Sequence, residues 1–222
     1  MKICVIIPAY NEALSIGKII AEIRKQNLNV LVVDDGSTDN TSKVVSSGGA
    51  VLLVNNTNHG KGSCLIKGFG YALENGFDAV ITMDGDGQHL ARDIPSFLKA
   101  AENSNNSIFV GNRMLSTKNM PAERIITNKF MSCLISIITK QRLPDTQCGF
   151  RLIKRELLQK MKLTTRNYEI ESEIILRASS LGAKIESVPI STVYEGNKSM
   201  INPFMDAFRF IRFILEEIFK KH

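Results

Sequence analysis

The feature that most constrains the fold is a regular alternation, along the first half of the chain, of short apolar runs with longer helix-like segments. Runs rich in valine and isoleucine, each bounded by turn residues, predict buried strands at 2–8, 30–34, 50–54, 79–83 and 107–111. The intervening segments predict helices at 12–25, 38–47, 62–75 and 94–101. This alternation is typical of an α/β fold in which helices cover both faces of a mostly parallel sheet.

The second half is less regular and predicts helices at 123–140, 168–181 and 203–221, with a strand at 184–189. The last of these helices is amphipathic, basic and rich in phenylalanine. It therefore fits either packing against the rest of the chain or docking on a membrane surface or a partner protein. No repeat or linker interrupts the 222 residues, and we expect one domain over residues 1–222.

Charge and cysteine content narrow the choice of partners and compartment. The net charge of +6 favours anionic partners such as nucleotide diphosphates, lipid phosphates or an acidic membrane face, but it is too diffuse to indicate nucleic acid. The four cysteines are scattered, which predicts reduced thiols. No apolar run approaches the roughly 20 residues that span a bilayer. We expect a cytoplasmic protein, with peripheral attachment to the inner face of the membrane as an option.

Polar motifs follow the first two predicted strands, at the carboxyl ends where parallel sheets bind ligands. The first motif is PAYNE at 8–12 and the second is DDGSTDNT at 34–41. Residues 36–39 fit a turn followed by a helix N-cap. That interpretation leaves two adjacent carboxylates, Asp34 and Asp35, unexplained at the end of an apolar strand. We therefore expect one of them to contact a nucleoside.

The fourth predicted strand runs into the segment MDGDGQH at 83–89. In extended backbone, residues two apart point the same way, so Asp84 and Asp86 can present both carboxylates to one cation, with Gln88 as a third contact. Oxygen ligands suit Mg²⁺ or Mn²⁺, and Mg²⁺ often completes its shell with substrate phosphates. A calcium-binding EF-hand loop is excluded, because no bidentate glutamate closes the segment.

Taken together, these motifs resemble the family 2 glycosyltransferases, which have the A-type nucleotide-sugar transferase fold. Within that family the sequence is most similar to polyprenyl-phosphate sugar transferases such as the dolichol-phosphate mannose synthases. The matching segments occur in order at 8–12 (PAYNE), 32–41 (VVDDGSTDNT), 58–62 (NHGKG), 84–89 (DGDGQH), 111–113 (GNR) and 145–151 (DTQCGFR).

The resemblance implies an inverting transfer from a UDP- or GDP-linked sugar to a polyprenyl phosphate. It implies a nucleoside site formed by Pro8, Tyr10, Glu12 and Asp35. It implies that Asp84, Asp86 and Gln88 hold the Mg²⁺ or Mn²⁺ that bridges the donor diphosphate. It also suggests that Arg113 and Arg124 reach the acceptor phosphate. Lys61, in a glycine-rich segment, either meets a donor phosphate or stays solvated.

The predicted helix at 123–140 supports an acceptor site on independent grounds. Arg124, Asn128, Ser132 and Ser136 recur every four residues and form one polar row on an otherwise apolar helix. An arginine at the head of such a row can bind a phosphate, while the apolar faces contact core or lipid. A small-polar packing seam on a buried helix explains the same row equally well.

Four side chains near the motifs have open roles. Arg151 fits an ion pair or a ligand contact, His89 fits a donor contact, and Glu169 and Glu171 fit crevice-lining or capping groups. A phosphate acceptor is already an anion and needs no general base, whereas a hydroxyl acceptor needs one, for which Asp145 is a weak candidate.

Two alternatives to the lipid-phosphate transferase remain. The segment 192–199 lacks the arginine that many lipid-phosphate enzymes carry there, so a saccharide hydroxyl acceptor stays open. A non-catalytic membrane-docking subunit also stays open, although it has no need of the two carboxylates. A dehydrogenase is excluded because no GxGxxG turn follows the first strand, and a sugar nucleotidyltransferase because that position lacks a glycine-rich, arginine-bearing loop.

Overall fold

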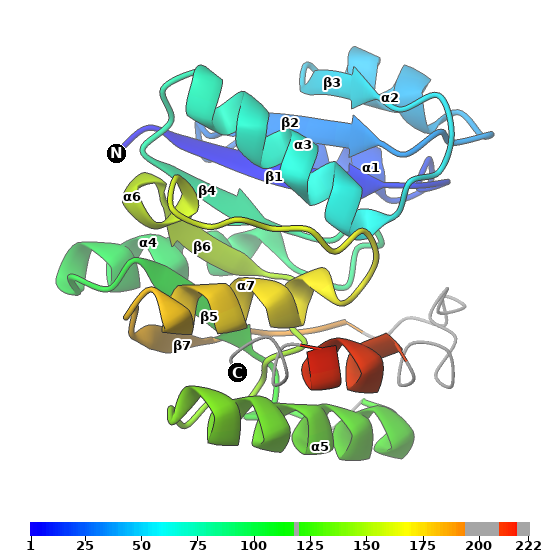
Figure 1. The fold of residues 1–222 in the computed structure, drawn as a ribbon. Helices are drawn as coiled ribbons and strands as arrows, with labels where there is room; N and C mark the ends of the chain where they lie inside the picture. The colour runs from blue at the N-terminus through cyan, green and yellow to red at the C-terminus, as the bar shows by residue number, and fades with distance from the viewer. Residues whose placement is uncertain (118–119, 194–208, 217–222) are drawn as a thin grey trace.

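The computed structural model describes residues 1–117, 120–193 and 209–216 (Figure 1). One seven-stranded sheet has the order β3-β2-β1-β4-β6-β5-β7. Its strands are β1 (Ile3–Ala9), β2 (Asn29–Asp34), β3 (Val51–Val54), β4 (Ala79–Thr82), β5 (Ile108–Asn112), β6 (Arg151–Lys154) and β7 (Ile185–Pro189). All pairings are parallel except those of β6, which is antiparallel to both β4 and β5.

Helices cover both faces of this sheet. They are α1 (Ile16–Arg24), α2 (Thr41–Ser47), α3 (Lys61–Glu74), α4 (Ile94–Asn103), α5 (Ala122–Thr139), α6 (Arg155–Leu158) and α7 (Ile170–Ser180), with a 3₁₀ turn η1 (Ala91–Asp93) before α4. Figure 1 shows α3 and α7 on one face and α1 and α4 on the other, while α5 packs beside α7 away from the sheet. Residues 209–216 are also helical.

The pattern of apolar residues explains this layering. The central strands β1 and β2 are buried along nearly their whole length, as expected for parallel strands with helices on both sides. Helix α1 buries Ile16, Ile19, Ile20 and Ile23, whose spacing of three and four residues places them on one face. The predicted α/β fold, mostly parallel with helices on both faces, is confirmed. Within the described residues, no helix is long and apolar enough to cross a membrane.

Two predictions of elements need correction. The first helix was expected from residue 12 but begins at Ile16, because Asn11 has a left-handed backbone (φ 57°) and residues 13–15 form a turn. Strand β6 was not predicted, since it is only four residues long and has a charged residue at each end. The helix expected at 203–221 lies largely outside the described residues.

Strand directions bring the polar motifs together at one edge of the sheet. Because β1, β2, β4 and β5 run in the same direction, the residues that follow them meet there. Strand β6 runs the opposite way, so the segment before it, 145–150, reaches the same edge from the second half of the chain. This edge carries the candidate site.

Candidate active site

The loops after β1 and β2 are joined into one rigid surface. The Oδ1 atom of Asn11 accepts a hydrogen bond from the backbone N–H of Thr38 at 2.8 Å. The backbone N–H of Glu12 donates to Oγ1 of Thr41, also at 2.8 Å. The PAYNE segment, with Pro8, Tyr10 and Glu12, is therefore held against the turn that starts α2.

The adjacent carboxylates Asp34 and Asp35 organise the backbone around this surface. Asp34 accepts hydrogen bonds from the N–H of Ser37 and the hydroxyl of Ser42. Asp35 accepts from the N–H groups of His59 and Gly60 at 2.9 and 2.7 Å, and so fixes the loop that leads into α3. Both side chains are buried. These contacts explain why two carboxylates stand together, and the predicted nucleoside contact stays a prediction.

Lys61, the first residue of α3, lies largely buried between two carboxylates, with its side chain 15% exposed. Its Nζ atom lies 2.5 Å from Oδ1 of Asp84 and 2.6 Å from Oε1 of Glu171, which is in the first turn of α7. Burial disfavours the charged ammonium, but the two carboxylates outweigh it and raise the pKa of Lys61. Burial likewise opposes ionisation of Asp84, yet Lys61 lowers the pKa of Asp84 to about 2. Lys61 and Asp84 are therefore both charged at neutral pH, and the solvated lysine considered from the sequence is not what the structure shows.

His89 is hydrogen-bonded to the backbone of Asp84. Its Nδ1 atom accepts a hydrogen bond from the backbone N–H of Asp84 at 3.2 Å, and its ring packs on Phe150 with centroids 5.3 Å apart. Burial lowers the pKa of His89 to about 4, so the ring is neutral at pH 7. With its side chain only 2% exposed, His89 positions the backbone of the DGDGQH segment, and the donor contact considered for it does not fit this placement.

Three carboxylates from the ends of β1 and β4 influence one another. Burial, reinforced by the charge of Asp84, raises the pKa of Asp86, whose Oδ1 accepts the backbone N–H of Gln88 at 2.9 Å. Burial also raises the pKa of Glu12 to about 7, with further contributions from Asp86 and Asp84. Mutual repulsion of this kind is relieved by a cation.

The predicted acceptor arginines lie close to this group. Arg113 donates from Nε and Nη2 to the carboxylate of Asp145 at 2.8 and 2.9 Å. Arg124, near the start of α5, donates to Oε1 of Gln88 at 3.4 Å. Because Asp145 is completely buried and held by this two-pronged ion pair, it positions Arg113 and is poorly placed to act as a general base.

The DTQCGFR segment closes the site from the second half of the chain. A Cβ atom added to Gly149 would lie 2.9 Å from both Oδ1 of Asp84 and Nζ of Lys61, so the backbone passes directly beside that ion pair. Arg151 is buried and donates to the carbonyls of Cys148, Thr146 and Glu171 at 2.8, 2.9 and 2.6 Å. It holds the loop through these three backbone carbonyls, which gives it a structural role, and the ligand contact considered for it stays untested.

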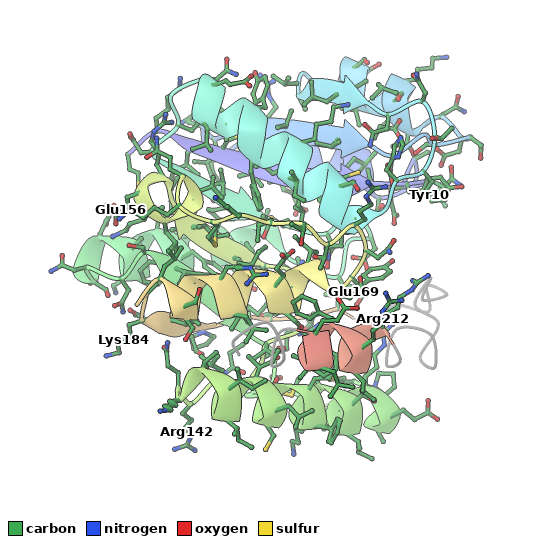
Figure 2. The ribbon with its side chains drawn as sticks, in the orientation of Figure 1. Tyr10, Arg142, Glu156, Glu169, Lys184 and Arg212 are labelled. Carbon is green, nitrogen blue, oxygen red and sulfur yellow. The ribbon has the colours of Figure 1, made fainter. Side chains whose placement is uncertain are left out.

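Figure 2 shows Tyr10 and Glu169 at the same end of the molecule, whereas Glu156 and Lys184 lie at the opposite end. The residues predicted after β1, β2, β4 and β5 are thus brought to one edge. Sequence reasoning missed the contact of Glu171 with Lys61 and the close approach of Gly149. Neither has a local signal, because both depend on where β6 and α7 are placed in the fold.

Known proteins are similar to this chain in sequence. The chain is 39% identical over 202 residues to an uncharacterized protein of Methanocaldococcus jannaschii, covering 85% of this chain and 87% of that one. It is 30% identical over 215 residues to the UDP-N-acetylglucosamine–dolichyl-phosphate N-acetylglucosaminyltransferase of Methanococcus voltae, covering 86% of each.

Two solved structures have the same fold. Mannosyl-3-phosphoglycerate synthase from Rubrobacter xylanophilus superposes with a TM-score of 0.80 at 21% identity, covering 100% of this chain and 75% of that one. Glucosyl-3-phosphoglycerate synthase from Mycobacterium tuberculosis, in complex with Mn²⁺, UDP and glucosyl-3-phosphoglycerate, gives a TM-score of 0.73 at 18% identity, covering 95% and 76%. The architecture is therefore the A-type nucleotide-sugar transferase fold.

Residues 4–162, well over half of the chain, match the family described as glycosyl transferase family 2. The order of the motifs, the sheet that gathers them and the relatives agree with that match. The chain belongs to glycosyl transferase family 2.

Proposed function

We propose that this family 2 glycosyltransferase is metal-dependent and moves a sugar, with inversion, from a UDP- or GDP-linked donor to a polyprenyl phosphate. The observation that carries the proposal is the group of mutually repelling carboxylates at the carboxyl edge of the sheet, with Asp84 and Asp86 at its centre. In such a sheet this edge is where nucleotides bind.

The donor set fits a hard divalent cation. Asp84, Asp86 and Gln88 offer the carboxylate and amide oxygens that Mg²⁺ and Mn²⁺ prefer. Within the ranges that the structure describes, no three histidine, cysteine or acidic side chains form a complete metal cage. Further ligands would have to come from elsewhere, and the oxygens of a donor diphosphate are suitable. A cation there would stabilise the charge that develops on the departing nucleoside diphosphate.

The remaining donor contacts follow from the positions of the loops. A nucleoside lying across the ends of β1 and β2 would contact Pro8, Tyr10 and Glu12, with Asp34 and Asp35 supporting the loops behind them. Lys61 enters from the start of α3 on the side of Asp84, where a diphosphate bound to the cation would lie within reach of the ammonium.

An anionic acceptor agrees with the contacts of Asp145 and His89, the two side chains near the site that could be considered as a general base. Asp145 is engaged by Arg113, and His89 is buried beneath Asp84, so neither is placed to take a proton from a hydroxyl. A phosphate acceptor needs no such step. Arg124 donates a hydrogen bond to Gln88, one of the proposed cation ligands. Together with Arg113 it would hold an acceptor phosphate for attack on the sugar carbon.

A lipid acceptor agrees with the outer face of α5. Ile126, Phe130 and Ile137 are 69%, 56% and 68% exposed, and their spacing places them along one side of the helix. Arg124 and Ser132 point inward on the other side. A helix with charge beside the site and an apolar outer row suits a substrate whose phosphate enters the protein while its chain stays in a membrane. The Methanococcus voltae relative is named for a dolichyl-phosphate acceptor.

The test is a panel of UDP- and GDP-sugars with Mn²⁺ or Mg²⁺ and three acceptors: polyprenyl phosphate in vesicles, a free saccharide, and a small phosphorylated hydroxy acid. We expect transfer to the lipid phosphate, abolished by EDTA. Transfer only to a saccharide or hydroxy acid would replace the proposed acceptor and leave the donor half intact. Absence of both transfer and donor hydrolysis would favour a non-catalytic docking role.

The substitution Asp86→Asn removes one charge from the proposed cation site without changing its size. We expect transfer to fall by about a hundredfold or more, because the developing diphosphate charge loses its counter-charge. Titration of Mn²⁺ in the presence of UDP should show the same loss of binding, whereas Asp78→Asn, at the opposite edge of the sheet, should retain both. Unchanged Mn²⁺ binding and transfer in Asp86→Asn would contradict the assignment.

A further inference from the structure

Lys61 is already paired with the Asp84 carboxylate that the proposed cation would use. Its Nζ atom forms a direct ion pair with Oδ1 of Asp84, at 2.5 Å. A divalent cation bound to the same oxygen would sit beside the ammonium, and the two positive charges would repel. The ion pair with Lys61 therefore opposes binding of a cation to the Asp84 carboxylate, and a weakening of that pair would favour the cation.

Glu171 is a second ion-pair partner of Lys61. Its Oε1 atom accepts from the ammonium at 2.6 Å, and its side chain is only 6% exposed. Its other oxygen, Oε2, is buried and has no hydrogen-bond partner within the described part of the chain. A buried carboxylate oxygen without a partner is costly, and an ammonium has three N–H donors. Glu171 can therefore accept a second hydrogen of Lys61 when Asp84 lets it go.

We propose that Lys61 is a resident counter-ion that holds Asp84 until a divalent cation binds, and that Glu171 then takes Lys61 over. The inference rests on the metal-dependent function proposed above. In it Glu171 is a positioning residue, since it acts on the cation only through Lys61. The exchange keeps the charges of Asp84 and Glu171 compensated before the donor arrives and gives Glu171 a second hydrogen bond afterwards.

Two single variants change the exchange in opposite directions. Lys61→Met removes the competitor, so Mn²⁺ should bind in the absence of nucleotide about tenfold more tightly. Glu171→Gln removes the alternative partner, so Lys61 stays on Asp84 and Mn²⁺ should bind about tenfold more weakly. Because Lys61→Met leaves buried carboxylates without their counter-ion, Lys61→Gln serves as a second, more polar variant if the first fails to fold.

The double variant separates transfer of Lys61 from simple loss of charge. If Glu171 acts through Lys61, adding Glu171→Gln to the Lys61→Met background should change Mn²⁺ affinity less than about twofold. A purely electrostatic effect of Glu171 would weaken binding equally in both backgrounds. Glu169→Gln removes a carboxylate from the same end of α7 and should leave Mn²⁺ affinity near that of the wild type.

Calorimetric titration of MnCl₂ into each folded variant, checked by circular dichroism, gives distinct outcomes. Tighter binding in both Lys61 variants, with non-additivity in the double variant, supports the inference. If the wild type binds Mn²⁺ and the variants match it, or if the Glu171 effect is the same in both backgrounds, the exchange is overturned and the proposed function stands. If the wild type binds no Mn²⁺ with or without UDP, the cation-dependent function fails and the exchange fails with it.

Discussion

At the scale of single residues, Gly149 has little room. Its backbone passes so close to Asp84 and Lys61 that a Cβ would lie 2.9 Å from an atom of each. Both neighbours are the flexible ends of side chains, so they can move, but the movement would shift the ion pair on which the proposed cation site depends. The φ of Gly149 is not positive, so its backbone conformation does not demand glycine. The close approach of Asp84 and Lys61 is what favours glycine at this position.

The substitution Gly149→Ala is therefore expected to lower transfer about tenfold or more, because small displacements of reacting groups have large effects on rate. Folding should be affected much less. The matched control is Gly70→Ala in α3, where no atom lies within 4 Å of the added Cβ. That change should leave transfer unchanged and raise the free energy of unfolding by about 0.5–1 kcal/mol. Wild-type transfer in Gly149→Ala would show that the close approach is not needed.

Glu12 makes stability depend on pH. Burial, with Asp86 and Asp84, raises its pKa to about 7 in the folded chain, whereas an unfolded glutamate titrates near about 4.3. Between these values the folded state binds more protons than the unfolded state, so raising the pH through this window lowers the free energy of unfolding. Above about pH 7, ionisation of Glu12 causes no further decrease in the free energy of unfolding.

We expect Glu12→Gln to reduce the loss of stability between pH 5 and pH 8 by about 1 kcal/mol, a figure lowered for solvent screening of this half-buried group. Urea unfolding at four pH values measures it. Glu74→Gln makes the same charge change on the exposed end of α3 and should leave the pH dependence as in the wild type. An identical pH profile in Glu12→Gln and the wild type would contradict the raised pKa.

At the scale of elements, α5 has an inward polar row beside the site and an outward apolar row. Its inward row includes Arg124 and Ser132, and Ser132 bonds to the buried segment before β6 through the N–H of Thr146 at 2.9 Å. Both interpretations of the polar row thus have support: the small hydroxyls form a packing seam, and the arginine at the head lies beside Gln88. The outward row of Ile126, Phe130 and Ile137 has no such partner within the described structure.

If that outward row contacts a membrane, Ile126→Ser with Phe130→Ser should weaken cosedimentation with anionic vesicles and lower transfer to polyprenyl phosphate about tenfold. Donor hydrolysis, which needs no lipid, should be unchanged. Leu181→Ser, which removes an exposed leucine at the end of α7, is the control and should behave like the wild type. Unchanged vesicle binding in the double variant would move the lipid contact elsewhere.

The elements also show why the sequence predicted some features and not others. Short apolar runs bounded by turn residues mark the parallel strands, so β1 to β5 and β7 could be predicted to within about two residues. Strand β6 has only two apolar residues, Leu152 and Ile153, between Arg151 and Lys154. Its role comes from pairing with β4 and β5, and pairing partners leave no periodic pattern in a single sequence.

At the scale of the whole molecule, the two sides of the site differ in how far the sequence could predict them. The positions of Asp34, Asp35, Asp84 and Asp86, on the proposed donor side, could be predicted because they lie at or shortly after the ends of recognisable strands. The side that completes it, with Asp145, Gly149 and Glu171, depends on the insertion of β6 between β4 and β5. A single sequence does not specify that insertion, and so the partner of Lys61 could not be foreseen.

The position of β6 also bears on how the chain folds. Strands β1 to β4 can assemble largely from neighbouring βαβ units, whereas β6 must close a long loop to reach β4, and loops of that length form slowly. A newly made chain would thus carry the aspartates of the donor side before α7 delivers Glu171. The arrival of the second half would complete the proposed site by bringing Glu171 to Lys61, so the slowest folding step and the onset of activity would coincide.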